Sequence, residues 1–395
     1  MTREELKIIM SDIKPLDMAA QEAAKKRQAA LVKPPESLGE LENMTIKLAG
    51  IREKLCGSLK KQIILIMSAD NGICDEGVSS APQSVTKAQT INFTRRLTGV
   101  SSMAKYFNID LLVTDVGIKE TIPRELYTEK TLSAIVDNKI LNRRIKSSTN
   151  NFAKTKAMSE QDVLEAIAVG LEVVETIKHG GYDVFGIGEM GIGNTTTSAA
   201  VLSAILGIGS EETVGRGGGL NDRSFSRKKE VVDEALMRYG FLHKTEKTDC
   251  IDSIEIIDII SAVGGFDIAA MTGAYLGAAL YRIPVVVDGY ISAVAALCAE
   301  RLYKEMIGGA ECDVRISDFM FASHKSAEKG YILAVEKLEL QPILDLKMRL
   351  GEGSGCPLAF KILEAAQSSF ELMGTFAEAE INDEYLEEIR NGNSF

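Results

Sequence analysis

The sequence predicts an α/β protein whose core is a doubly wound parallel sheet. Short apolar runs typical of buried strands alternate with stretches of helical periodicity along most of the chain. Several of these runs end directly in a polar, glycine-containing loop that precedes a helix. Because the carboxyl ends of parallel strands meet at one edge of a sheet, these loops are expected to converge on one ligand-binding crevice.

Two strands are predicted in the first third of the chain. Residues 62–68 (QIILIMS) form a continuous apolar run that ends in Asp70-Asn71-Gly72 and opens into a polar loop. Residues 109–117 (IDLLVTDVG) give the second strand. Residues 1–60 are mostly helical in pattern, whereas 119–160 are charged and rich in Asn and Ser, which indicates a surface excursion with short elements.

Three further strand-to-loop junctions follow. An amphipathic helix over 159–180, with Ser159 as its N-cap, leads into an apolar run at 182–187. A β-branched strand near 283–287 ends in Asp288-Gly289. The stretch 318–331 has the same pattern of a strand followed by a polar loop, with Ser323 and His324 at the strand end.

Composition excludes several classes of protein. The chain of 395 residues is 45% apolar, enough for a sizeable core, and its net charge of −11 without a long basic run argues against a nucleic-acid groove or adsorption to an anionic membrane. The charged N-terminus lacks the apolar core of a signal peptide, and no apolar run reaches membrane-spanning length. Six scattered cysteines without a CxxC pair and only three histidines predict a reduced cytoplasmic protein without a structural metal.

The stretch 182–202 (YDVFGIGEMGIGNTTTSAAVL) carries the strongest functional signal. Glycines at 186, 188, 191 and 193 separate the apolar strand from a helix that Asn194 or Thr195 can cap. Such a turn presents free N–H groups and a helix dipole to an anion, which favours a phosphate site over a purely structural turn. Glu189 would repel that anion, so it either faces another part of the ligand or is a solvated loop carboxylate.

Two other stretches are candidates for the same site. Residues 214–232 combine glycines with Arg216, Lys228 and Lys229, which fits either a second anion contact or a mobile surface loop with a basic helix start. Glu352 stands between two glycines just before a helix. A carboxylate on such a tight turn can project into a pocket, although a solvated turn glutamate is the commoner case.

These motifs together resemble the nicotinate-nucleotide–dimethylbenzimidazole phosphoribosyltransferase family over nearly the whole chain. The segments that carry the resemblance, in the family's order and spacing, are KPPESLGELE (33–42), ADNGICDEGVSSAPQSVT (69–86), GIGEMGIGNTTTSAA (186–200), VGRGGGL (214–220), DGYISAVAAL (288–297), SHKSAEKG (323–330) and LGEGSG (350–355). The glycine loop and the LGEGSG turn together are highly specific.

The resemblance implies a fold and an activity. It implies a Rossmann-like parallel six-stranded sheet flanked by helices in a large domain (61–340), and a small helical domain built from both chain ends (1–60 and 341–395). It further implies a homodimer that uses no cofactor. The implied reaction converts nicotinate mononucleotide and 5,6-dimethylbenzimidazole into α-ribazole 5′-phosphate and nicotinate, in assembly of the cobamide nucleotide loop.

The resemblance also assigns roles to residues of this chain. Glu352 matches the catalytic base, and Lys228 matches a basic residue near the phosphate. The remaining residues implied in substrate binding are Glu189, Gly191, Ile192, Gly193, Asn194, Thr195, Gly217, Gly219, Gln89, Asp288 and Ser323.

Departures from the family pattern leave the acceptor base open. Asn71 replaces a usual His, Tyr331 replaces another, and Ala81 lies near the base-binding stretch. Other benzimidazoles, purines or phenols are alternative acceptors. Two other classes are a nicotinamide-dependent oxidoreductase, whose glycine fingerprint is not evident, and a non-catalytic nucleotide-binding partner subunit, which would not need Glu352.

Overall fold

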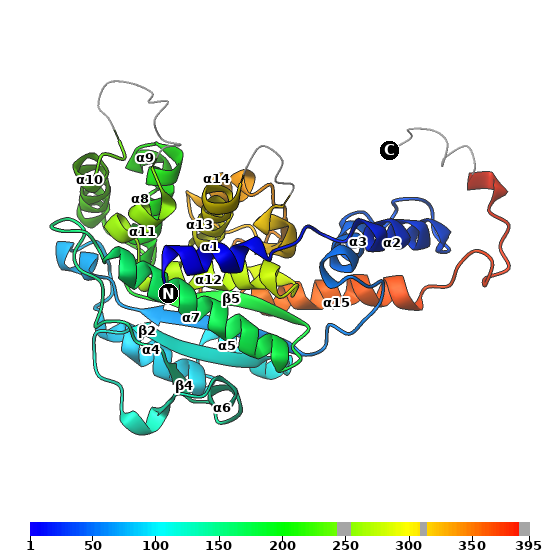
Figure 1. The fold of residues 1–395 in the computed structure, drawn as a ribbon, viewed down its shortest axis with the longest axis horizontal. Coiled ribbons are helices and arrows are strands. Elements are labelled where there is room, and N and C mark those ends of the chain that lie inside the picture. The colour runs from blue at the N-terminus through cyan, green and yellow to red at the C-terminus, as the bar shows by residue number, and fades with distance from the viewer. Residues whose placement is uncertain (243–253, 309–313, 387–395) are drawn as a thin grey trace.

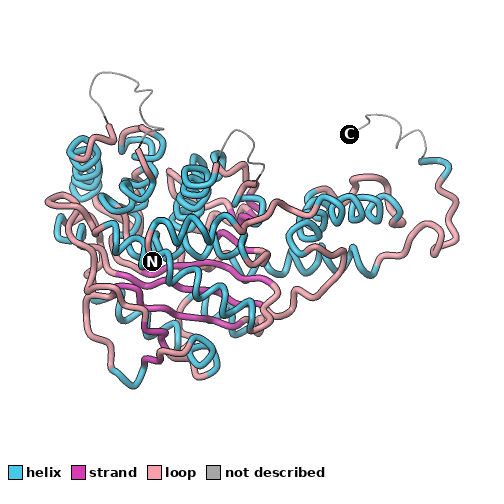
Figure 2. The backbone as a smooth tube through the Cα atoms, in the orientation of Figure 1, coloured by secondary structure: helices cyan, strands magenta, loops and turns pink. Residues whose placement is uncertain are grey.

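The computed structural model describes residues 1–242, 254–308 and 314–386. Cys250 and Cys312, and the end of the predicted C-terminal segment from 387 onward, lie outside these ranges. A single parallel sheet forms the centre of the molecule, with helices above and below it (Figures 1 and 2). Within the described ranges, no helix combines the length and apolar character that crossing a bilayer needs.

Among the described residues, the sheet has eight strands in the order β3-β4-β2-β1-β5-β6-β7-β8, and every pairing is parallel. The strands are β1 (Gln62–Ala69), β2 (Asp110–Gly117), β3 (Tyr127–Thr128), β4 (Ile140–Asn142), β5 (Val184–Met190), β6 (Val285–Val287), β7 (Met320–His324) and β8 (Pro342–Leu344). β1 and β5 lie at the centre and are buried along their whole length. Their continuous apolar character follows from burial on both faces.

The prediction of six strands is therefore wrong. The three strands for which the sequence predicted no segment are short and lie toward the two edges, at β3 and β4 on one side and at β8 on the other. Two of them lie within 119–160, which the sequence predicted as a surface excursion with short elements. Strands of two or three residues show no hydrophobic period, so sequence reasoning had nothing to detect.

Helices cover both faces of the sheet, as right-handed crossovers require. On one face lie α7 (Glu160–His179), α8 (Asn194–Leu206), α11 (Ile256–Val263), α12 (Phe266–Leu280) and α13 (Tyr290–Ile307), with α1 (Arg3–Ser11) outside α12 and α13. On the other face lie α4 (Ser84–Thr94), α5 (Gly99–Tyr106) and α15 (Cys356–Leu372). Shorter or peripheral helices are α6 (Thr131–Val136), α9 (Ser210–Thr213), α10 (Asp222–Arg238) and α14 (Tyr331–Lys337).

The predicted helix before the central strand is confirmed as α7. Ser159 and Asp162 form a capping box at its start, so two free N–H groups of the first turn are satisfied. α7 lies close against α12 because Gly170 and Gly273 face the backbone of the opposite helix. A side chain at either glycine would displace one of the two helices.

A group of helices from both chain ends projects from the sheet at the right of Figure 1. It consists of α2 (Met18–Ala30), α3 (Glu40–Arg52) and the far end of α15, joined by a backbone bridge between Leu31 and Thr375. Ala24, Leu31, Ala49 and Phe370 form a hydrophobic cluster of its own between them. This packing supports the predicted small domain, which stays a prediction because the domain boundaries are not tested.

Candidate active site

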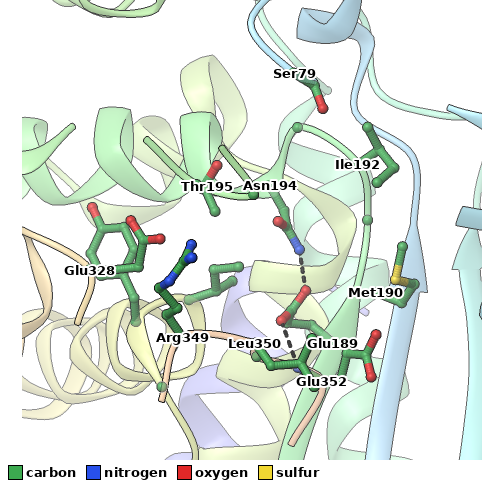
Figure 3. A pocket seen from close by; sticks show the side chains of 18 of the residues that line it. Ser79, Glu189, Met190, Ile192, Asn194, Thr195, Glu328, Arg349, Leu350 and Glu352 are labelled. Atoms are coloured by element: carbon green, nitrogen blue, oxygen red, sulfur yellow. Dashed lines mark hydrogen bonds between the residues drawn. The ribbon is translucent and has the colours of Figure 1, made fainter. Parts of the chain in front are cut away.

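A cavity of about 600 Å³ opens at the carboxyl ends of β1, β5 and β6. Its walls come from the loop after β1, from α4, from the turn between β5 and α8, and from the segment before α15 (Figure 3). Ligands of open parallel sheets bind at this edge. The junctions after β1, β5 and β6, which the sequence marked as candidates, therefore border one space.

The turn that the sequence predicts to bind an anion is short and runs from Gly191 to Gly193, and it is called the anion-binding turn below. The sequence expected Asn194 or Thr195 to cap α8, but Gly193 occupies the N-cap position with φ of +93° and no side-chain cap. The N–H of Asn194 donates to the Gly191 carbonyl at 3.0 Å and that of Thr196 to the Gly193 carbonyl at 2.9 Å. The N–H groups of Gly193 and Thr195 have no partner among the described residues and are available to a ligand. Thr195 faces the cavity from the first turn of α8 (Figure 3).

Side chains from the β1 junction fix the backbone of Ile192. Its N–H donates to Thr86 Oγ1 at 3.0 Å, and its carbonyl accepts from Asn71 Nδ2 at 3.4 Å and from Cys74 Sγ at 3.1 Å. Asn71, the departure noted in the sequence, thus supports the turn through its amide. The conformation of the turn therefore depends on hydrogen bonds with Asn71, Cys74 and Thr86, which lie far from it in the chain.

Lys228 is the cation next to this turn. It extends from α10, is 1% exposed, and donates from Nζ to Thr195 Oγ1 at 2.9 Å and to the Gly215 carbonyl at 3.2 Å. An ammonium group has three donors, so one is left for a ligand. Burial lowers the pKa of Lys228 to about 8. The nearby charge of Glu328 opposes this lowering, and a phosphate at the turn would oppose it further.

Glu189 is not the solvated loop carboxylate that the sequence offered as one alternative. It lines the cavity, and its contact with another part of the ligand stays a prediction. β5 continues through Met190, so Glu189 is a strand residue, and it is only 6% exposed. Its carboxylate accepts from Asn194 Nδ2 and, at 3.3 Å, from the backbone N–H of Glu352 (Figure 3). Burial, with the nearby charge of Asp267, raises the pKa of Glu189 to about 8. Glu189 therefore links the anion-binding turn to the Glu352 turn.

Glu352 lies in the centre of a left-handed turn. Gly351, Glu352 and Gly353 have φ of +77°, +63° and +82°, a conformation that costs a glutamate about 1–2 kcal/mol. Gln89 Nε2 donates to Glu352 Oε1 at 3.1 Å, and Oε2 has no partner among the described residues. Burial raises the pKa of Glu352, while the bond from Gln89 opposes that rise. Oε2 is thus a buried oxygen at the cavity wall without a hydrogen bond, and a donor on a ligand would satisfy it.

Gly186 and Gly188 serve this turn rather than the anion. A Cβ at Gly186 would meet Cys356, and a Cβ at Gly188 would lie 2.5 Å from the Glu352 carbonyl group. The Glu352 turn therefore sits directly on the glycines of β5. These glycines allow a loop from the end of the chain to lie on the central strand.

We expect Gly188→Ala to push the Glu352 turn outward, because the neighbouring atoms belong to the backbone and cannot rotate away. Overpacking of this kind costs about 1–3 kcal/mol, so urea melts should show a lower free energy of unfolding. Gly209→Ala is a matched control, since a Cβ there would meet only Asp233 Oδ1 at 3.7 Å. Equal stability of the two variants would contradict this packing.

The other predicted residues divide into two groups. Gly217 lines the cavity beside Thr195 and Lys228, whereas Gly219 lies outside the lining. Asp288 reaches the cavity wall but is 1% exposed, and Ser323 lies behind it and donates to its carbonyl at 2.8 Å. Ser323 is therefore placed to support the β6 junction rather than to reach a ligand.

Sequence reasoning missed two charged side chains of the cavity. Arg349 and Glu328 both line it, and Arg349 points toward Thr195 and Glu328 in Figure 3. Arg349 stands shortly before Glu352 in the chain, and Glu328 belongs to the loop after β7. Their positions beside predicted site segments were the signal that could have identified them.

Comparison with known proteins gives one consistent result. A family model described as phosphoribosyltransferase matches residues 13–381. The nicotinate-nucleotide–dimethylbenzimidazole phosphoribosyltransferase of Clostridium perfringens (strain ATCC 13124) is 44% identical over 383 residues, 97% of each chain. The protein of the same name from Clostridium tetani is 41% identical over 379 residues, 96% of each chain.

The solved structures agree. The crystal structure of CobT from Thermus thermophilus superposes with a TM-score of 0.80 at 32% identity, covering 92% of this chain and 99% of that one. A second structure from the same organism, titled as the nicotinate-nucleotide–dimethylbenzimidazole enzyme, gives a TM-score of 0.79 at 31% identity and covers 93% and 99%. The chain therefore belongs to the nicotinate-nucleotide–dimethylbenzimidazole phosphoribosyltransferase family.

Proposed function

We propose that the protein transfers the phosphoribosyl group of nicotinate mononucleotide to 5,6-dimethylbenzimidazole, giving α-ribazole 5′-phosphate and nicotinate in assembly of the cobamide nucleotide loop. One observation carries the proposal: a single cavity holds both an anion-binding turn and a buried carboxylate with a free oxygen, Glu352. The names of the relatives, at 44% and 41% identity over nearly the full chain, support the same reaction.

The chemistry accounts for this pair of features. The pyridine nitrogen of nicotinate mononucleotide is quaternary, so the breaking C1′–N bond leaves its electron pair on nicotinate and no general acid is needed. The acceptor forms the new bond to C1′ through one ring nitrogen and loses the proton of the other. Glu352 is the proposed base for that proton. Attack opposite to the leaving group converts a β-nucleotide into an α-nucleotide.

The other residues position the donor. The N–H groups of Gly193 and Thr195 and the Lys228 ammonium are the proposed phosphate contacts, with Gly217 beside them. Because the phosphate is remote from the reacting bond, its binding energy serves to hold C1′ in place.

The acceptor occupies the apolar part of the cavity in this proposal. Val78, Ala81, Val85, Met190 and Leu350 line that part, next to Gln89 and Glu352. A flat aromatic base fits such a lining. Other benzimidazoles, purines and phenols are alternative acceptors, and a homodimer and a cytoplasmic location stay predictions.

The test is a turnover assay without added metal. Purified protein is incubated with nicotinate mononucleotide, with and without 5,6-dimethylbenzimidazole, and nicotinate and α-ribazole phosphate are quantified by chromatography. Base-dependent release of both in equal amounts is expected. If dimethylbenzimidazole and a panel of purines and phenols all fail while the nucleotide binds, the protein is a non-catalytic partner subunit or sensor.

We expect kcat/KM for nicotinate mononucleotide to be bell-shaped in pH. The acid limb reports protonation of Glu352, whose pKa is raised, so activity falls as pH decreases through that value. The alkaline limb reports loss of the Lys228 proton near its pKa of about 8, because a neutral amine no longer attracts phosphate. Lys228→Arg should move the alkaline limb upward, since arginine stays charged. If the alkaline limb of Lys228→Arg stays where it is, that limb reports the titration of Glu189, whose pKa is also about 8.

A further inference from the structure

Asp288 forms an internal anchor for the Glu352 turn. It follows β6 directly, and its carboxylate accepts the N–H of Gly353 at 3.0 Å on one oxygen and the N–H of Gly355 at 2.7 Å on the other. These N–H groups lie where the left-handed turn meets the start of α15. Successive N–H groups in such a turn form a concave anion site, and the helix start adds its dipole. Here the anion is a side chain of the protein itself.

The surroundings of Asp288 are closed to solvent. Ser323 Oγ donates to its backbone carbonyl, and its own N–H donates to Ser292 Oγ at 3.1 Å. The titratable groups that face its carboxylate are His324, with Nδ1 at 3.8 Å, and the side chains Tyr275, Tyr331, Cys356, Glu189 and Glu352. Both carboxylate oxygens already accept from the turn, so Asp288 is poorly placed to bind substrate.

We propose that Asp288 is a positioning residue: it holds the backbone of Gly353 and Gly355 so that Glu352 is aimed at the acceptor base. Its two contacts come after Glu352 in the chain, and the Glu189 contact is to the N–H of Glu352 itself. The turn is thus fixed on both sides of the base by buried carboxyl groups. This inference rests on the proposed function and replaces the substrate-binding role expected for Asp288 from the sequence.

The first test is Asp288→Asn. The amide keeps one acceptor but presents an NH₂ group to one of the two N–H donors, so the turn loses one bond and shifts. A displacement of about 1 Å at a reacting group can cost about 10²-fold in rate. We expect kcat to fall about ten- to a hundredfold, with the Kd for nicotinate mononucleotide changed less than about twofold because the anion-binding turn is untouched.

The pH dependence of kcat in Asp288→Asn distinguishes a positioning role of Asp288 from a loss of folded protein. The charge of Asp288 raises the pKa of Glu352, so its removal should move the acid limb of kcat to lower pH. The groups facing Glu352 are Glu189, Asp288 and Gln89, and only Asp288 is changed. Loss of fold alone would lower the amount of active protein and leave the limb where it is.

Gly355→Ala tests the same anchor without removing the carboxylate. Gly355 has an ordinary right-handed conformation, with φ of −79°, but a Cβ there would lie 3.0 Å from Asp288 Oδ1 and still closer to Ser323 and His324. We expect the same loss of kcat with retained nucleotide binding. Ser354→Ala is the control on the same turn, because its buried hydroxyl has no partner among the described residues, and wild-type activity is expected.

Each outcome of these experiments either supports or overturns the positioning role of Asp288. Wild-type kcat in folded Asp288→Asn, or a loss of nucleotide affinity as large as the loss of kcat, overturns the inference. If Asp288→Asn does not fold by circular dichroism, Gly355→Ala decides by the same criteria. Wild-type protein that produces no α-ribazole phosphate refutes the proposed reaction instead, so the two failures are distinguishable.

Discussion

Replacing Glu352 by glutamine is expected to reduce kcat by about 10²- to 10⁴-fold, the usual contribution of a positioned general base. Glutamine keeps the size of the side chain and can still contact Gln89, but it cannot take the proton of the acceptor. Binding of nicotinate mononucleotide, measured by calorimetry, should be unchanged, since the anion-binding turn and Lys228 are intact.

The control for this variant is another glutamate held in the same backbone conformation. Glu380 has φ of +53° and is exposed, so Glu380→Gln repeats the chemical change on a left-handed residue outside the cavity. Its kcat should equal that of the wild type. Turnover by Glu352→Gln within about tenfold of wild type would place the base elsewhere in the cavity.

Replacing Lys228 by methionine is expected to weaken nucleotide binding more than it lowers kcat, the reverse of the result expected for Glu352→Gln. Methionine fills a similar buried volume but removes the charge, and a hydrogen bond to a charged group contributes about 1.5–3 kcal/mol. The Kd for nicotinate mononucleotide should therefore rise about 10- to 150-fold. At saturating nucleotide, kcat should fall much less, because the acceptor, Glu352 and Gln89 are unchanged.

Lys229→Met is the matched control for this loss. Lys229 is the next residue of α10, but its ammonium pairs with Glu211 at 2.6 Å and lies outside the cavity lining. Calorimetric titration with nicotinate mononucleotide and with ribose 5-phosphate should show weakened binding of both ligands only in Lys228→Met. If the two variants bind equally well, the phosphate site is not at Lys228.

Sequence reasoning identified the parts of the fold that bury long apolar segments. β1, β2 and β5 have seven or eight residues each, and their apolar runs were recognised. β3, β4 and β8 have two or three residues and are ordered by their neighbours, so no local pattern marks them. The sequence thus predicted the centre of the sheet and missed its edges.

The site shows a similar division. Motifs indicated Glu352, the turn at Gly191 to Gly193, and Lys228, and all of them border one cavity. The roles of Glu189 and Asp288 could not be predicted, because they depend on contacts between residues far apart in the chain. Glu189 and Glu352 are 163 positions apart, and Asp288 and Gly355 are 67 apart. Such contacts are properties of the folded structure rather than of a local pattern.

The placement of Glu352 after β8 also sets an order of events during synthesis. All eight strands precede the Glu352 turn in the chain, and that turn must settle on glycines of β5, a strand made much earlier. A nascent chain adds about 5–20 residues per second, so the last strand is made about one to a few seconds before α15 is complete. Until the Glu352 turn docks on β5, the cavity lacks the carboxylate that we propose as the base. A chain released before residue 352 is made would therefore lack the proposed base altogether.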